Sequence, residues 1–331
     1  MLNVVMIAVV WSITIGSAFM WRGWYLERSQ CNDGCKTTPS PFGLIDVVLM
    51  FAAVLILPGL VIASLLHLWG ADLSALSPLQ LNTLSTASSL TQLIACISVV
   101  ALGCLRYGTP KTILGFDRKL LVQHFKDALG GFIMVAPFLF GVQWILSIFV
   151  PYEHNTIDQL KDNFSWSTIL VTWLGAVIAA PICEELFFRG ILQNWLQRLQ
   201  STASQKNPFV EITGGWGDLD DGDFANSVPD RSAKPRQPSW LASELGLDHD
   251  GVRTKMDWWL PIGISSFLFA LVHIGQGLAP IPLFIFGLAL GNLFRRTGSI
   301  VPPILLHFLL NGFSMFWVTL ESWLLSIEQT V

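Results

Sequence analysis

The sequence predicts an all-α protein, a polytopic transmembrane helical bundle of about eight spans. Hydrophobic residues make up 52% of the 331 residues and charged residues only 13%, against roughly 25% charged residues in an average soluble domain. A soluble chain of this length cannot bury so much apolar surface. The net charge of −4 leaves no electrostatic footprint for nucleic-acid binding. We therefore expect the lipid bilayer as a partner, and no nucleic acid.

Eight apolar runs are long enough, or nearly so, to cross a hydrocarbon core of roughly 30 Å. They are Leu2–Trp21, Phe42–Leu68, Leu84–Leu105, Leu129–Val150, Ser167–Cys183, Trp258–Ile274, Ile281–Phe294 and Ile300–Leu325. No Lys or Arg precedes the first run, and Arg22 and Arg28 follow it. This pattern predicts an uncleaved anchor and not a signal peptide. The first four runs and their loops form an N-terminal region, 1–160.

The last four runs form a C-terminal core over 161–326. The fifth run continues past Cys183 as an amphipathic extension over Glu184–Leu199. Between the fifth and sixth runs lies a polar block, 201–256, which is rich in Gly, Pro, Asp and Ser. Such a composition cannot bury a core, so the block predicts a solvated cytoplasmic insert.

The distribution of positive charge predicts the orientation of the spans. Alternate loops hold 18 of the 19 Lys and Arg residues, and these loops are 22–41, 106–128, 189–257 and 295–299. Because cytoplasmic loops carry the excess of positive charge, the alternation predicts eight spans with both termini outside. We expect a multi-pass protein of a bacterial-type plasma membrane, with its site opening toward the cytoplasm.

Ionisable side chains inside an apolar span are costly and mark functional sites by default. The first such group is Glu184, Glu185 and Arg189. Residues four apart on a helix are separated by about 40° around the axis, so Glu185 and Arg189 share a face and can pair. Glu184 is turned by about 100° and stays available for proton transfer. A structural salt bridge near the membrane interface is the alternative interpretation.

Two further groups lie in the last three runs. His273 follows Phe269 by one turn, and His307 and Asn311 are again four residues apart. Taken singly, these residues fit hydrogen bonds that clamp helices together. Taken together, a carboxylate, two imidazoles and a carboxamide supply a general base and electrophilic or metal-ligating groups. That set is suited to activating water in a membrane-embedded cavity.

The motifs Glu-Glu-x-x-x-Arg (184–189), Phe-x-x-x-His (269–273) and His-x-x-x-Asn (307–311) resemble the CPBP intramembrane proteases. This is the CAAX prenyl endopeptidase type II and bacteriocin-processing family, also called the ABI family. The segment 284–291, with glycines at 287 and 291, is similar to the glycine-rich helix of that family. The resemblance covers about residues 165–320, and the insert between the first two motifs departs from it.

The resemblance implies a role for each matched residue. Glu184 would be the general base that polarises the attacking water, and His273 would share that water. His307 and Asn311 would position the water or stabilise the oxyanion, and Glu185 with Arg189 would support them. The family is commonly labelled metalloprotease, often with zinc. Glu184, His273 and His307 could supply three ligands to Zn²⁺ with an open water position, and a metal-free, glutamate-dependent mechanism is left open.

We therefore expect an intramembrane endopeptidase that hydrolyses membrane-associated or C-terminal CAAX-like peptides. The substrate would be a peptide or protein, and neither its identity nor the oligomeric state follows from the sequence. One alternative is a non-catalytic membrane scaffold or immunity-type protein, in which the polar residues only clamp helices. Another is a proton-coupled transporter that uses Glu184 and the two histidines as a relay, although no paired repeats are evident.

The predicted helices place the two histidines at different depths. His273 lies roughly 22 Å along a helix that begins at Trp258, whereas His307 lies about 10 Å into its own, at 1.5 Å per residue. For the two to meet, the sixth helix must be tilted or begin outside the bilayer. Otherwise the turn 275–280 must dip into the membrane, which is tolerated where backbone lines a cavity.

Overall fold

The computed structural model of the protein describes residues 17, 42–150, 164–205 and 259–328. Every regular element within these ranges is a helix, which confirms the all-α prediction for that part of the chain. The predicted anchor Leu2–Trp21 lies outside the described residues except for Ser17, whose hydroxyl donates to the Met134 carbonyl at 2.9 Å. Most of the predicted insert 201–256 also lies outside them.

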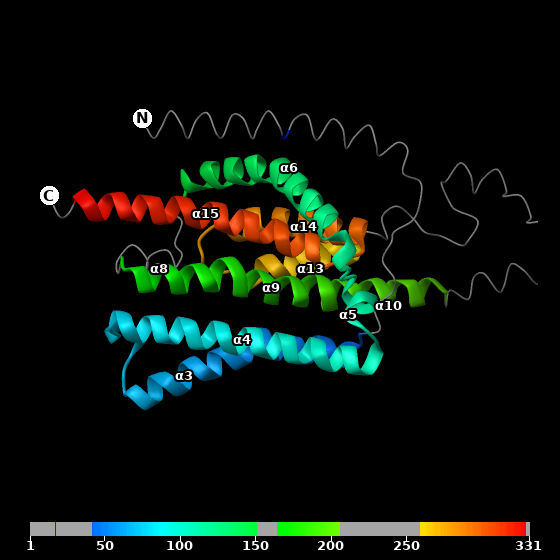
Figure 1. The fold of residues 1–331 in the computed structure, drawn as a ribbon, viewed down its shortest axis with the longest axis horizontal. Coiled ribbons are helices and arrows are strands. Elements are labelled where there is room, and N and C mark those ends of the chain that lie inside the picture. The colour runs from blue at the N-terminus through cyan, green and yellow to red at the C-terminus, as the bar shows by residue number, and fades with distance from the viewer. Residues whose placement is uncertain (1–16, 18–41, 151–163, 206–258, 329–331) are drawn as a thin grey trace, which may run out of the picture. The chain divides into compact units, whose positions relative to one another are not determined.

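The helices follow one another in the order shown in Figure 1. The α-helices are α2 (Leu44–Phe51), α3 (Leu57–Trp69), α4 (Pro78–Tyr107), α5 (Pro110–Leu114), α6 (Leu121–Ser147), α8 (Trp166–Trp173), α9 (Ala180–Glu185), α10 (Asn194–Gln205), α13 (Trp259–Leu271), α14 (Pro280–Thr297) and α15 (Val301–Glu328). The π-helices are η1 (Ala52–Ile56), η4 (Leu174–Ala179) and η5 (Leu186–Gln193), and the 3₁₀ turns are η2 (Leu73–Ala75) and η3 (Arg118–Leu120).

Five helical stretches of the described chain are long and apolar enough to cross a membrane. They are Leu44–Trp69, Pro78–Tyr107, Arg118–Ser147, Trp166–Gln200 and Val301–Leu324. The sixth predicted run differs, because α13 has only 13 residues and is about 20 Å long at 1.5 Å per residue. The described residues therefore support a multi-pass membrane protein, and the count of eight spans stays a prediction.

The chain divides into two compact units. One comprises Met1–Trp195 with Ile262–Val331, and the other comprises Leu196–Pro261. The second unit is described only over 196–205 and 259–261. All six predicted site residues belong to the first unit.

Within the first unit, the long helix that begins at Trp166 lies between two sets of helices (Figure 1). On one side α4 packs against α8, η4 and α9. On the other side α15 packs against η4, α9 and α6, while α14 packs against η5. Hydrogen bonds also link the helices of this unit. The Asn82 amide donates to Thr168 Oγ1 at 3.2 Å, and Ser265 Oγ donates to the Phe188 carbonyl at 2.8 Å.

Local sequence explains where individual helices begin and end. Ser77 caps α4 by accepting from the Gln80 N–H, and the Gln80 side chain accepts in return from the Ser77 N–H at 2.9 Å. Gly115 ends α5 at a φ of 66° and contacts the loop that follows α14. A Cβ atom at Gly115 would overlap the Gly298 carbonyl oxygen, so only glycine allows this close approach.

The helix that carries the first motif is unusual because two π-helical segments, η4 and η5, flank the short α9. At the end of η4 the Ala180 N–H donates to the Gly175 carbonyl, five residues earlier. The next donor in that series would be residue 181, but Pro181 has no N–H. The Ala176 carbonyl is thus left without its π-type partner inside the helix.

Candidate active site

Glu185 and Arg189 form a fully buried ion pair, as their spacing predicts. Arg189 Nη1 lies 2.8 Å from Glu185 Oε1, and neither side chain is exposed to solvent. The i,i+4 geometry brings the two groups together on one face, even though Arg189 belongs to a π-helical segment. A buried charge needs a partner to be tolerated, so each of these residues depends on the other. Arg189 had been counted among the cytoplasmic loop charges, and that assignment is wrong because the side chain is buried within a helix.

His307 joins this ion pair from α15. Its Nδ1 atom lies 3.0 Å from Glu185 Oε1, and the side chain is almost completely buried. Because a carboxylate paired with arginine is an acceptor only, we assign the hydrogen of this bond to Nδ1. In the tautomer with this hydrogen on Nδ1, the imidazole presents the lone pair of Nε2 on its other side.

Glu184 lies on that other side. Its Oε2 atom is 3.8 Å from His307 Nε2, which is too long for a direct hydrogen bond. Its side chain is 17% exposed, whereas that of Glu185 is fully buried. The two adjacent glutamates therefore differ as predicted, since one is held in an ion pair and the other is accessible.

Three aromatic rings enclose the polar cluster. The His307 ring packs edge-to-face against Phe269, at 5.9 Å, and against Phe286, at 5.1 Å between centroids. The Arg189 guanidinium carbon lies 4.6 Å from the Phe269 ring centre and 5.8 Å from that of Phe188. These rings restrict the orientation of both polar groups and keep water away from the ion pair.

Sequence reasoning missed Gln193, which is fully buried at the end of η5. Its Nε2 donates to the Gly291 carbonyl at 3.0 Å, and Arg189 Nη2 donates in parallel to the Gly287 carbonyl at 3.2 Å. A signal was present, because positions 185, 189 and 193 recur every four residues and share one helical face.

His273 occupies a different position from the one predicted. It lies in the turn that follows α13, which ends at Leu271, and not within a helix. The turn contains Gly275 and Gly277, both with positive φ, which a regular helix does not allow. His273 Nδ1 bonds the Phe269 carbonyl at 2.8 Å, and its ring shares Phe269 with the His307 ring. The turn after the sixth run thus begins before His273, and its dip into the membrane stays a prediction.

Asn311 is bonded to a helix carbonyl. Its Nδ2 donates to Ala176 O at 2.9 Å, the oxygen left without a π-type partner by Pro181. This bond fits the alternative interpretation, in which the polar residues only clamp helices together. The carboxamide retains a second N–H for other uses.

The resemblance implied a zinc site formed by Glu184, His273 and His307. Among the residues that the structure describes, no three His, Cys, Asp or Glu side chains are arranged to hold a metal ion. His307 has its Nδ1 engaged with Glu185, and His273 has its Nδ1 engaged with a backbone carbonyl. These bonds leave Nε2 of both histidines available, as in histidines that bind zinc, so the zinc site stays a prediction.

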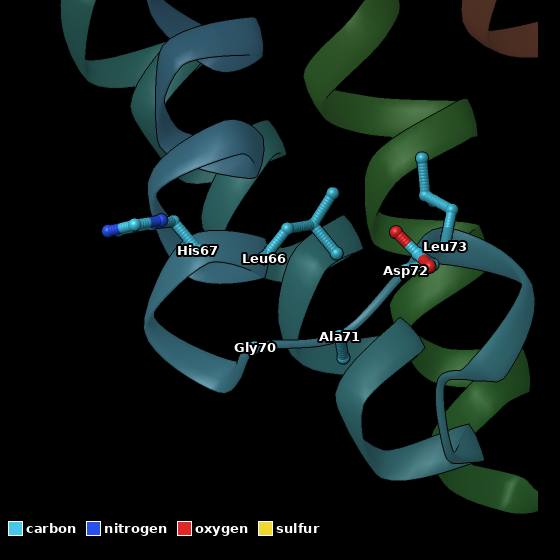
Figure 2. Close-up of a pocket in the computed structure, with 6 residues that line it drawn as sticks. All are labelled: Leu66, His67, Gly70, Ala71, Asp72 and Leu73. Atoms are coloured by element: carbon cyan, nitrogen blue, oxygen red, sulfur yellow. The ribbon is translucent and has the colours of Figure 1, made fainter.

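Figure 2 shows a separate hollow at the turn after α3, lined by Leu66, His67, Gly70, Ala71, Asp72 and Leu73. It shares no residue with the Glu184–His307 cluster. His67 points away from Asp72 in this view, so these two side chains do not form a catalytic pair.

Comparison with known proteins tests the resemblance. Residues 166–212 and 248–313 match the family model described as Type II CAAX prenyl endopeptidase Rce1-like. All six predicted site residues fall within the matched ranges, and residues 1–165 precede them. Searches of curated proteins and of solved structures found no match. The match supports the predicted resemblance, and this part of the chain is similar to the Rce1-like type II CAAX prenyl endopeptidases.

Proposed function

We propose that this chain is an intramembrane endopeptidase in which Glu184 activates water for attack on a peptide bond. The match to the Rce1-like family model supports the reaction class. The observation that carries the mechanism is the polar chain from Arg189 through Glu185 to His307, whose Nε2 faces Glu184 across 3.8 Å. The substrates are membrane-associated peptides or C-terminal CAAX-like peptides, and the site opens toward the cytoplasm of a bacterial-type plasma membrane.

In the first step, Glu184 accepts a proton from a water molecule, and the water oxygen attacks the scissile carbonyl carbon. His307 Nε2 faces Glu184 across 3.8 Å, close enough for one water to contact both groups. Since Nδ1 carries the hydrogen, Nε2 accepts from the water and orients it. Glu185 and Arg189 hold the ring in this tautomer.

In the second step, the C–N bond breaks and the leaving amine takes the proton from Glu184, which regenerates the carboxylate. The negative charge on the tetrahedral intermediate needs a hydrogen-bond donor. Asn311 offers its second amide hydrogen, the first being bonded to Ala176. His273 presents Nε2 as an alternative acceptor for the second water hydrogen, because its Nδ1 hydrogen is donated to the Phe269 carbonyl.

The test uses purified protein in liposomes with an internally quenched, farnesylated CAAX peptide and its unprenylated counterpart. We expect Glu184→Ala, His273→Ala and His307→Ala each to lower kcat/KM by about 10²–10⁴-fold, the usual loss of acid–base catalysis. His67→Ala is the matched control, because His67 is exposed at the end of α3. A triple variant that cleaves as fast as the wild-type protein would overturn the proposal.

Two additions extend this test. A proteomic comparison of cells carrying the wild-type protein or Glu184→Ala identifies natural substrates as precursors that accumulate uncleaved. Treatment of the active enzyme with a chelator should leave its rate unchanged if protein groups alone activate the water. A loss that Zn²⁺ restores would instead assign a metal to Glu184, His273 and His307.

A helix-clamping scaffold is the second candidate, and the Asn311 bond to Ala176 favours it. In a scaffold these residues would stabilise packing without any reaction. The two functions differ in measurable ways, because a scaffold predicts that Asn311→Ala and His307→Ala lower the thermal stability of a wild-type protein that has no peptidase activity.

A further inference from the structure

Gln193 is buried and polar, yet the mechanism above does not use it. Its carboxamide makes one bond, from Nε2 to the Gly291 carbonyl, and its Oε1 has no partner among the described residues. A buried amide that is only half paired adds little net stability, and an apolar side chain of similar shape replaces it at little cost. We therefore look for the role of this carboxamide in the orientation of the helix that it contacts, and not in stability.

The geometry of the bond points to α14. Arg189 and Gln193 are four residues apart on η5, and their acceptors Gly287 and Gly291 are four residues apart on α14. The two side chains thus form two parallel hydrogen bonds between η5 and α14. A single hydrogen bond would let α14 rotate about it, whereas two hydrogen bonds restrain both the rotation and the register of α14 relative to η5.

The glycines at 287 and 291 leave their carbonyl oxygens accessible to these two side chains. A helical carbonyl retains a second lone pair, which a side chain from another helix can reach where no Cβ atom intervenes. A Cβ atom at Gly291 would lie 2.8 Å from Gln193 Oε1 and 2.9 Å from Ile262 Cγ2. Gly291 therefore admits Gln193 and nothing larger at this point of contact.

The position of α14 matters because it carries Phe286. This buried ring contacts the His307 ring edge-to-face at 5.1 Å, and the two planes are 88° apart. A rotation of α14 would withdraw Phe286 and free the imidazole to turn away from Glu184. The hydrogen bond from Gln193 to Gly291 therefore restrains the His307 imidazole through Phe286.

We propose that Gln193 is a positioning residue, which holds α14 through Gly291 so that Phe286 keeps the His307 imidazole aligned with Glu184. This inference rests on the proposed peptidase function for its kinetic test, and a spectroscopic test is independent of that function.

The experiment compares Gln193→Met with Gln92→Met in the full-length protein. Gln92 makes the same kind of bond, from Nε2 to the Val54 carbonyl at 3.1 Å, but between α4 and η1. We expect Gln193→Met to lower kcat by about tenfold or more, as misplacement of a reacting group does, with KM and melting temperature unchanged. Gln92→Met should leave all three quantities unchanged.

A second readout is the ¹⁵N signal of the His307 ring in histidine-labelled protein, assigned by its loss in His307→Ala. Gln193→Met should broaden or shift this signal at constant pH, and Gln92→Met should not. Gly291→Ala provides a second route to the same displacement and should reproduce both effects. An unchanged kcat and ring signal in Gln193→Met would overturn the proposal. An inactive wild-type protein with a shifted ring signal would overturn only the peptidase function.

Discussion

Glu185 accepts two hydrogen bonds on a single oxygen, one from Arg189 and one from His307. Its second oxygen is buried without a partner among the described residues, as is Arg189 Nε. The pair is therefore isolated from water and balanced mainly by its own opposite charges. Removing either charge leaves the other one uncompensated in an apolar interior.

This balance gives a prediction for single and double variants. Glu185→Met or Arg189→Met alone should lower the free energy of unfolding by about 3–5 kcal/mol, because each leaves one buried charge unpaired. The double variant should be more stable than either single variant. Urea unfolding in detergent measures all three, and a double variant as unstable as the sum of the single losses would contradict the prediction.

A surface pair supplies the control for that cycle. Lys111 Nζ lies 2.8 Å from Asp117 Oδ2, and the lysine side chain is 69% exposed. Exposed ion pairs contribute about 0–1 kcal/mol. Lys111→Met should therefore change the free energy of unfolding by less than about 1 kcal/mol.

Among the elements, α13 and α14 lie in close contact at Gly287. A Cβ atom at this position would lie 2.9 Å from Ser266 Cβ and 3.1 Å from Ser266 Cα, so neighbouring backbone would have to move. The same glycine offers its carbonyl to Arg189. The packing of α14 against α13 and the geometry of the Arg189 ion pair therefore both depend on the absence of a side chain at Gly287.

Gly287→Ala should destabilise the protein by about 1–3 kcal/mol, the usual cost of overpacking a filled interface. Gly141→Ala in α6 is the matched control, because a Cβ atom there has no neighbour within 4 Å. It should be neutral, or stabilising by up to about 1 kcal/mol, since alanine is the better helix former. Thermal unfolding of the two variants in one detergent tests the difference, and equal shifts would contradict it.

Sequence predicted some features of these elements and not others. The long apolar helices follow from length and composition alone, and the Glu185–Arg189 pair follows from local spacing. The bond between His307 and Glu185 joins residues 122 positions apart and depends on how α15 packs against α9. His273 was placed in a helix because its neighbours are apolar, whereas the positive φ of Gly275 and Gly277 ends the helical path there. Periodicity does not report such backbone angles.

At the scale of the whole molecule, charge sorting predicts which loops face the cytoplasm. The turn at Asp72 belongs to a loop without Lys or Arg, and Lys119 belongs to a loop with five. Both residues are exposed in the structure. The positive-inside rule therefore places Asp72 outside and Lys119 in the cytoplasm.

This orientation is testable in a variant that lacks the five native cysteines. Asp72→Cys should react with a membrane-impermeant maleimide in intact cells, and Lys119→Cys should react only after the cells are lysed. The reverse pattern would contradict the predicted orientation. Equal labelling of both positions in intact cells would contradict a single orientation.

The π-helical turns of η4 carry a consequence for chain length. A π-turn contains more residues than an α-turn, so the face that presents Glu184 and Glu185 depends on the number of residues between Trp166 and Pro181 as well as on their chemistry. Deleting one residue of η4 while restoring α-helical winding would leave the helix beyond it in place, but the same change of winding with every residue kept would rotate everything beyond it by about 100°. Both carboxylates would then be directed away from His307, although no side chain of the site had changed. Counting residues in this segment is thus as informative for recognising active relatives as matching the motif itself.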